Sequence, residues 1–357
     1  MRRLNSCLRA AMALGVLTLP LWGQSPAIKP GAWAGKGIFD VLEGVMSDDA
    51  ATSAAASAEL ARRGPTDVRG TLTSGITLAG LLPDAEAQAG VRTERLVSAL
   101  ARLGPKAVPQ LRVIVEQGGL EGALATATLG EIGPVAAKDT APILVAAFAS
   151  PTTLVRGGAA NAVVKLGPGA VPALLQGLVH SNAELRGQSA RALGRLKAEP
   201  LRVVPALITA LREADEEVRV QAAKALSAFG AEAQAAVPVL LDPATGEELD
   251  EGDFAEALAA IAGSSRAPLV QALNAGRPIA SDRAGLALGL GHPPAIDELI
   301  AALAHPSAHV RKIACVALNA ARAEAGKAAP AVARLLEDSD AKVREAAQAT
   351  LAALRRH

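Results

Sequence analysis

A proline followed fourteen residues later by an arginine occurs four times in this chain of 357 residues. The pairs are Pro142 and Arg156, Pro172 and Arg186, Pro205 and Arg219, and Pro330 and Arg344, each within a similar arrangement of apolar residues. A pattern that returns at a period of about 30 residues is typical of a solenoid, in which each repeat buries its apolar face against its neighbours. The spacing therefore predicts an architecture and says nothing of an activity.

Each repeat is predicted to contain two helices. In the segment VVPALITALREADEEVRVQAAKALSAFG the apolar residues stand three and four positions apart, which is the period of a helix and not of a strand. The repeated proline suits the opening of the first helix, because the first amides of a helix have no internal partner. Tyrosine is absent and aromatic residues make up 2% of the chain, so a sheet protein is not expected.

Each second helix is predicted from signals around its arginine. Four residues before the arginine stands an N-capping side chain, which is Thr152, Asn182, Asp215, Ser307 or Asp340. Small core residues follow three positions after it (Ala159, Ser189, Ala222, Ala314, Ala347), and larger ones seven positions after it (Val163, Leu193, Leu226, Leu318, Leu351). Glycines expected to end second helices are Gly64, Gly104, Gly133, Gly167, Gly230 and Gly263. Together these signals predict roughly nine or ten helix pairs from about Phe39 onward.

The strings EVRVQAAKALSAFG, LVRGGAANAVVKLG, HVRKIACVALNAA and KVREAAQATLAAL resemble HEAT repeats, in particular the short type found in phycobilisome lyases. This resemblance covers nearly the whole chain after residue 38. It implies an all-α, right-handed α-solenoid whose second helices line a concave face. Members of this family act as interaction scaffolds far more often than as enzymes, so the resemblance implies a binding surface.

Two sets of basic and polar residues are singled out on the second helices. The candidate partner-binding stripe is defined by positions five and nine residues past the repeat arginine, and consists of Asn161, Lys165, Arg191, Arg195 and Lys224. Such a stripe would attract an acidic segment of a protein partner, although an ordinary solvated helix face has the same composition. The repeat arginines Arg156, Arg186, Arg219, Arg311 and Arg344 are expected to be structural, joining adjacent repeats through the capping Asp and Asn side chains of their neighbours.

The first 27 residues read as a secretory signal peptide. Arg2, Arg3 and Arg9 precede an apolar run from Ala10 to Trp22, which is shorter than the roughly 20 residues that span a bilayer. The predicted organisation is a signal peptide (1–27), a linker rich in Gly and Pro (28–38) and a HEAT-like α-solenoid (39–357). We expect a bacterial protein exported to the periplasm or the extracellular space, with no membrane span after cleavage. An uncleaved anchor is the alternative.

No catalytic, cofactor-binding or metal-binding set is predicted. His305 and His309 are separated by Pro306 and Ser307, so they do not share one helix face, and the acidic loop around Asp242–Asp253 lacks the ligand order of an EF-hand. A net charge of +1 and the shortage of aromatic residues disfavour nucleic acid as a partner. Cys315, the single thiol after the signal peptide, is expected to be buried and inert.

The sequence thus predicts a non-enzymatic scaffold or adaptor that binds one or more protein partners on its concave face and needs no cofactor. The alternative is a bilin-lyase-like or other cofactor-handling accessory enzyme. A third hypothesis is a repeat module of a larger envelope complex. The identity of the partner and the oligomeric state are left open.

Overall fold

The computed structural model describes residues 35–64, 68–81, 85–242, 244, 251–263 and 265–354. The predicted signal peptide and most of the predicted linker lie outside the described residues. Within the described ranges the secondary structure consists of α-helices and short 3-10 helices joined by turns, and no strand occurs there. The all-α fold class predicted from the sequence is confirmed.

Ten helix pairs, which we number repeats 1 to 10, account for the described residues. The first helices are α2 (Ile38–Val45), α4 (Val68–Leu81), α6 (Val108–Gln117), α8 (Ala137–Ala146), α10 (Val171–Gly177), α12 (Pro200–Ala210), α14 (Val237–Leu241), α16 (Ala267–Asn274), α18 (Ile296–Ala302) and α20 (Ala329–Arg334). The second helices are α3 (Ala50–Arg63), α5 (Ala85–Ala101), α7 (Gly119–Ile132), α9 (Thr153–Lys165), α11 (Ala183–Leu196), α13 (Glu216–Phe229), α15 (Glu251–Ala262), α17 (Pro278–Leu290), α19 (Ala308–Ala320) and α21 (Ala341–Leu354). Several first helices are extended by the 3-10 helices η1 (Gly104–Ala107), η2 (Gly133–Ala136), η3 (Ala147–Ala149), η4 (Gly167–Ala170), η5 (Gly230–Ala236), η7 (Arg322–Ala328) and η8 (Leu335–Glu337).

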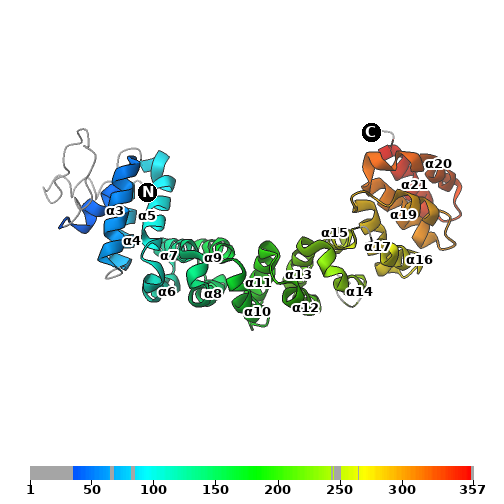
Figure 1. Ribbon diagram of the computed structural model, residues 1–357. Helices are drawn as coiled ribbons and strands as arrows, with labels where there is room; N and C mark the ends of the chain where they lie inside the picture. The colour runs from blue at the N-terminus through cyan, green and yellow to red at the C-terminus, as the bar shows by residue number, and fades with distance from the viewer. Residues whose placement is uncertain are drawn as a thin grey trace.

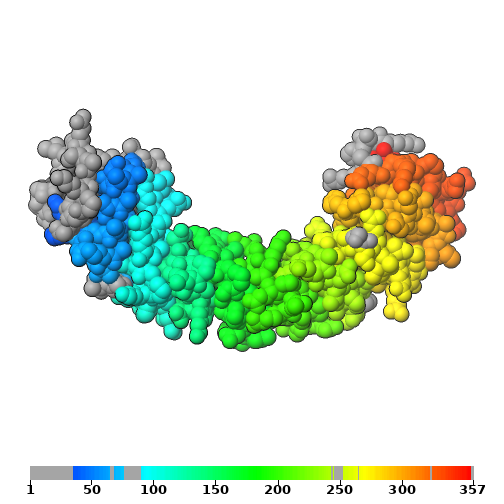
Figure 2. All heavy atoms as spheres, in the orientation of Figure 1, coloured from blue at the N-terminus to red at the C-terminus, as the bar shows by residue number. Residues whose placement is uncertain are grey.

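The repeats are stacked in chain order into an open arc (Figure 1). In this view the second helices α7, α9, α13 and α15 lie along the inner edge of the arc, and the first helices α6, α8, α10, α12 and α14 lie along its outer edge. Each second helix packs on the first helix of its own repeat and contacts the next second helix. The space-filling view shows the concave side as a broad hollow between two arms (Figure 2). A partner that enters the hollow therefore meets the second helices.

The core follows the predicted alternation of small and large residues. The five small residues three positions after the repeat arginines are all fully buried, and so are four of the five larger residues, with Leu351 8% exposed. Apart from Ser189, these side chains belong to one apolar cluster that runs from repeat 1 to repeat 10. Because the core extends along one axis, each repeat is stabilised chiefly by its two neighbours.

Both ends of the second helices behave largely as predicted. All six predicted closing glycines have a positive φ, between 49° and 76°. In repeat 5 the closing position is held by Lys197, which has a φ of 49° and is not a glycine. At the N-terminal ends, Asn182, Asp215 and Asp340 accept hydrogen bonds from backbone amides of their helices, whereas Thr152 and Ser307 hold the cap position without a side-chain bond.

The repeated prolines do not all open a helix. Pro172 and Pro330 are the second residues of α10 and α20, as expected, but Pro142 and Pro205 lie inside α8 and α12. The reason is that α8 and α12 begin five residues earlier, at Ala137 and Pro200. A proline at the sixth helical residue removes one backbone hydrogen bond of the helix, and both helices continue through it.

One apolar helical stretch in the described part of the chain, Gly119–Ala149, is long enough and apolar enough to cross a membrane by length and composition alone. It comprises α7, η2, α8 and η3, which form parts of repeats 3 and 4. Of the apolar window, 56% is buried within the protein. More than half of this window therefore contributes to the core of the fold.

Candidate functional site

The five repeat arginines bind the backbone of their own repeats. In each case Nη1 of the arginine donates to the carbonyl oxygens six and five residues earlier, at 2.6 to 3.2 Å. For Arg219 the acceptors are Glu213 and Ala214, which lie in the turn between α12 and α13. The carbonyls at the end of a helix have no internal partner, so the guanidinium closes the turn that joins the two helices.

The expected contact with capping side chains of neighbouring repeats is wrong. Two of the five arginines do reach an acid in the next repeat, but that acid lies in the turn and is not the capping residue. Arg311 holds Asp338 through two bonds, Nε to Oδ2 at 2.7 Å and Nη2 to Oδ1 at 2.8 Å, and Arg186 lies 3.7 Å from Glu213. The bonds from Arg311 and from the Asp340 amide lower the pKa of Asp338 below its usual value.

The candidate partner-binding stripe lies on α9, α11 and α13, and all five of its side chains are exposed. Most of its positive charge is shared with neighbouring groups. Lys165 Nζ lies 2.6 Å from Glu131 Oε2 on α7, and Lys224 Nζ lies 3.1 Å from Asp253 Oδ1 on α15.

The two arginines of the stripe differ in their surroundings. Arg195 Nη1 donates to Ala160 O at 2.9 Å and to Asn161 Oδ1 at 3.2 Å, so these two members of the stripe are brought together across repeats 4 and 5. Arg191 makes no side-chain hydrogen bond or ion pair with the described residues. It is therefore the member of the stripe whose charge is most available to a partner.

Two further arginines lie at a position equivalent to a member of the candidate stripe and were not predicted from the sequence. Arg62 of α3 and Arg102 after α5 stand two residues before the closing glycines Gly64 and Gly104, which is the place that Lys165 has before Gly167. Both side chains are exposed; Arg62 is bound to Glu59, and Arg102 has no such partner among the described residues. The sequence does contain a signal for them. Counting two residues back from a closing glycine identifies this position even in repeats that lack the repeat arginine.

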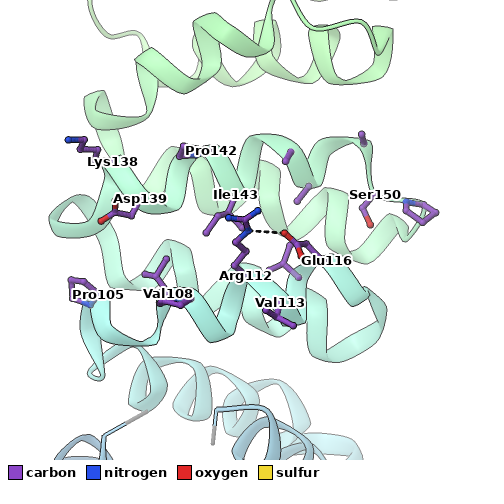
Figure 3. Close-up of a pocket in the computed structure, with 16 residues that line it drawn as sticks. Pro105, Val108, Arg112, Val113, Glu116, Lys138, Asp139, Pro142, Ile143 and Ser150 are labelled. Carbon is purple, nitrogen blue, oxygen red and sulfur yellow. Dashed lines mark hydrogen bonds and ion pairs between the residues drawn. The ribbon is translucent and has the colours of Figure 1, made fainter. Parts of the chain in front are cut away.

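A second surface feature lies on the outer side of the arc. A groove of about 1060 Å³ runs between the first helices α6 and α8. Figure 3 shows Val113 and Ile143 at this groove, with Arg112 bonded to Glu116 at 2.8 Å in its middle. The charged residues that line it are Arg112 and Lys138, together with Glu116 and Asp139. The groove thus has an apolar lining and no net preference for either sign of charge.

The histidines and the cysteine take structural positions. His180 and His305 each follow a first helix, and in both rings Nδ1 accepts a backbone amide two residues later, at 3.1 Å. His309 points elsewhere, with Nε2 2.8 Å from Asp282 Oδ1. Cys315 is fully buried, and its burial raises the pKa of the thiol to about 12.

In the described part of the chain, no group of three His, Cys, Asp or Glu side chains is placed to hold a metal ion. The predicted acidic loop falls mostly outside the described residues. What the described surface offers is an extended concave face with basic groups in its N-terminal and middle repeats.

A family model for HEAT repeats matches residues 171–262 and 266–352, which together make up half of the chain. The matched residues correspond to repeats 5 to 7 and 8 to 10. No curated protein matches the chain significantly.

Several solved structures are similar in fold. Importin beta is 16% identical with a TM-score of 0.45 over 89% of this chain and 55% of its own. The karyopherin Kap121p, solved bound to the SUMO protease Ulp1p, is 17% identical with a TM-score of 0.49 over 89% of this chain and 41% of its own. An archaeal HEAT-like repeats protein from Thermococcus onnurineus NA1 is 16% identical with a TM-score of 0.36 over 60% of this chain and 97% of its own. The present chain spans about half the length of importin beta and less than half of that karyopherin.

Proposed function

Because the chain belongs to the HEAT repeat family, we propose that it is a non-enzymatic scaffold or adaptor that binds a protein partner along its concave face. The single observation that carries the proposal is the open arc itself, whose inner side is formed by exposed faces of successive second helices. An extended concave surface of this kind suits recognition of a long segment by many weak contacts. The short repeats and the quoted arginine strings support assignment to the phycobilisome-lyase type of HEAT repeat.

The chemistry of the partner is proposed from the charge of the middle repeats. Lys165 and Lys224 form ion pairs with Glu131 and Asp253, so each attracts an acidic partner less strongly than an unpaired lysine would. Arg191 is exposed between them, and no described side chain neutralises it. An acidic side chain of the partner would complete this position, because an arginine binds a carboxylate through two parallel donors. We therefore expect an acidic protein segment.

The place of action is proposed from the N-terminal sequence. A basic start followed by a short apolar run supports export to the periplasm or beyond, and the mature chain would begin near residue 28. Partners would then belong to the cell envelope.

The proposal is tested by affinity capture. Residues 28–357 are used to capture partners from envelope extract of the source organism at low and moderate salt, with mass spectrometry as the readout. A protein retained at low salt and released at moderate salt is expected, since exposed charge pairs are screened.

The matched variants locate the surface. Arg191→Glu combined with Lys224→Glu should abolish capture. The control is Lys138→Glu, because Lys138 is an exposed lysine on the outer helix α8, and this variant should leave capture intact. Capture that survives the concave double variant would contradict the acidic partner. Loss of capture in all variants alike would contradict the concave surface.

A further inference from the structure

Among the described residues, seven repeats have an arginine bound to the carbonyl oxygen of the residue that follows the first helix or its final turn. In five of them the arginine is the repeat's own, as described above. The acceptors in those repeats are Ser150, His180, Glu213, His305 and Asp338. The same acceptor is satisfied in repeats 1 and 7, although neither repeat has an arginine at the corresponding position.

The corresponding positions in repeats 1 and 7 are filled by residues that cannot make this contact. Counting seven residues back from the buried Leu60 and Leu258 gives Ser53 and Glu251. The Ser53 side chain is too short for the turn and instead donates from Oγ to Val45 O, inside the first helix, at 2.7 Å. A glutamate has no donor to offer a carbonyl.

In both repeats the missing donor comes from the next repeat along the chain. Arg95 of α5 donates from Nη1 to Met46 O at 3.0 Å and to Ser47 O at 2.7 Å, closing the turn of repeat 1. Arg283 of α17 donates from Nη1 to Leu240 O at 2.9 Å and to Asp242 O at 3.0 Å, at the start of the connection in repeat 7. Ser47 and Asp242 each stand directly after the first helix, or its final turn, of their repeat.

Arg95 and Arg283 occupy one and the same place in their repeats. Each stands five residues before the large buried residue of its helix, Leu100 for Arg95 and Leu288 for Arg283. The repeat arginines stand seven residues before that residue, so the two donors are displaced by two positions toward the C-terminus. This shift turns the side chain from its own turn toward the preceding repeat, because two residues rotate a helical position by more than half a turn.

Both arginines are fixed by further contacts to the preceding repeat. Arg95 Nη1 also lies 3.0 Å from Asp48 Oδ1 in the turn of repeat 1. Arg283 is 1% exposed, and its guanidinium lies 4.6 Å from the ring centre of Phe254 in α15. A guanidinium over an aromatic face that also donates to two carbonyls is well suited to a buried position.

We propose that Arg95 and Arg283 are inter-repeat clasps that replace the missing arginines of repeats 1 and 7, so that these two repeats close their turns only when the following repeat is docked. In a linear array, stability is the sum of terms intrinsic to each repeat and terms for each interface. When the arginine belongs to the neighbouring repeat, the free energy of its hydrogen bonds contributes to the interface term and no longer to the intrinsic stability of the repeat. Repeats 1 and 7 are therefore coupled to repeats 2 and 8 through the interface.

The test uses repeat 1, since a terminal repeat can open while the rest of the solenoid stays folded. Hydrogen exchange of the full chain is followed by mass spectrometry for Arg95→Met. The amides of α2 and α3 are expected to exchange about tenfold faster, while those of repeats 5 and 6 keep the wild-type rate. Arg102→Met is the matched control, because Arg102 lies just beyond the same helix, is exposed and makes no bond to repeat 1.

The decisive variant restores the usual arrangement. Ser53→Arg, added to Arg95→Met, places an arginine where five other repeats have one, and it is expected to return the exchange of α2 and α3 to within about twofold of wild type. Wild-type exchange in Arg95→Met, or no recovery on adding Ser53→Arg, would overturn the proposal. This test does not depend on partner binding.

Discussion

The junction between repeats 5 and 6 and the junction between repeats 4 and 5 hold their second helices at different distances. In the first, a Cβ added to Gly194 would lie 2.7 Å from Ala225 Cα and 2.9 Å from Ala225 Cβ, so α11 and α13 are in backbone contact. In the second, the position that corresponds to Gly194 is Val164, and α9 touches α11 much less than α11 touches α13. A valine could not occupy the close spacing, because its Cβ would overlap the next helix.

The comparison shows that a glycine at this position accompanies direct backbone contact with the next second helix. Gly130 in repeat 3 has the same place as Gly194, and a Cβ there would lie 2.7 Å from Ala162 Cα in the next repeat. Gly289 in repeat 8 likewise faces the backbone of Ala317. Repeats of similar sequence are thus not spaced uniformly along the arc.

The largest effect is expected when the close junction is given the residue of the loose one. Gly194→Val should lower the free energy of unfolding by about 3 kcal/mol, because the backbone of Ala225 cannot yield as a flexible side chain could. Chemical denaturation measures the change. A destabilisation below about 1 kcal/mol would mean that the spacing of α11 and α13 is not set by Gly194.

A junction held by charge should respond to acid, unlike one held by backbone contact. The pair of Arg311 and Asp338 joins repeats 9 and 10, and its stabilisation is present above the ordinary carboxyl pKa of about 4 and is lost as pH falls through the lowered pKa of Asp338. Asp338→Asn should cost about 2 kcal/mol near neutral pH and should reduce the dependence of stability on pH below about 4. Unfolding curves at several pH values test this, and an unchanged acid dependence would contradict it.

A turn within one repeat should matter less than either kind of junction. Arg219→Ala removes the donor to Glu213 O and Ala214 O and is expected to cost about 1.5 kcal/mol, with a lower Tm. Arg212→Ala, an exposed arginine in the same repeat, serves as the control and should leave the Tm near that of wild type. A melting curve for Arg219→Ala that overlays wild type would show that the turn does not need its arginine.

The loose junction should tolerate change at the equivalent of Gly194. Val164 is only partly buried, so Val164→Ala is expected to cost about 0.5 kcal/mol by denaturant titration, much less than Gly194→Val. A cost as large as that of Gly194→Val would show that α9 and α11 are packed as closely as α11 and α13.

The smallest expected effect is a gain in stability. No atom lies within 4 Å of a Cβ built on Gly157, which faces solvent in the middle of α9. Gly157→Ala should therefore stabilise the protein by about 0.5 kcal/mol, since alanine favours the helix. This variant tests helix propensity alone, because Gly157 has no packing neighbour, unlike Gly194. A loss of stability would mean that Gly157, like Gly194, lies where a side chain does not fit.

Features encoded within one repeat could be predicted from the sequence, and features between repeats could not. The caps, the closing glycines and the alternating core depend on residues a few positions apart, so Asp215 and Gly230 were enough to define a helix. The positive φ of Lys197 could not be predicted, because no neighbouring residue indicates that a lysine will adopt this conformation. The two prolines inside helices show that a local signal places a helix but does not fix its first residue.

The exposure of the candidate stripe could be predicted from the sequence, and the neighbours of its charged groups could not. All members of the stripe are exposed, as the helical period implied, but the partners Glu131 and Asp253 belong to neighbouring repeats. Their approach depends on the register between second helices, which one repeat does not contain. Arg95 and Arg283 were missed for the same reason, since each acts on a turn that lies more than 40 residues earlier in the chain.

The burial of Cys315 has a consequence for the protein if it is exported, as proposed, to an oxidising compartment. While repeat 9 stays packed, the thiol is both shielded and protonated, so it cannot react with another chain. If that repeat opens, the thiol of Cys315 becomes available to pair with Cys315 of a second opened molecule, provided that an oxidant of the compartment accepts the two electrons and the two thiol protons are released. Disulfide-linked dimers would then accumulate with time, and their fraction would report how often repeat 9 opens.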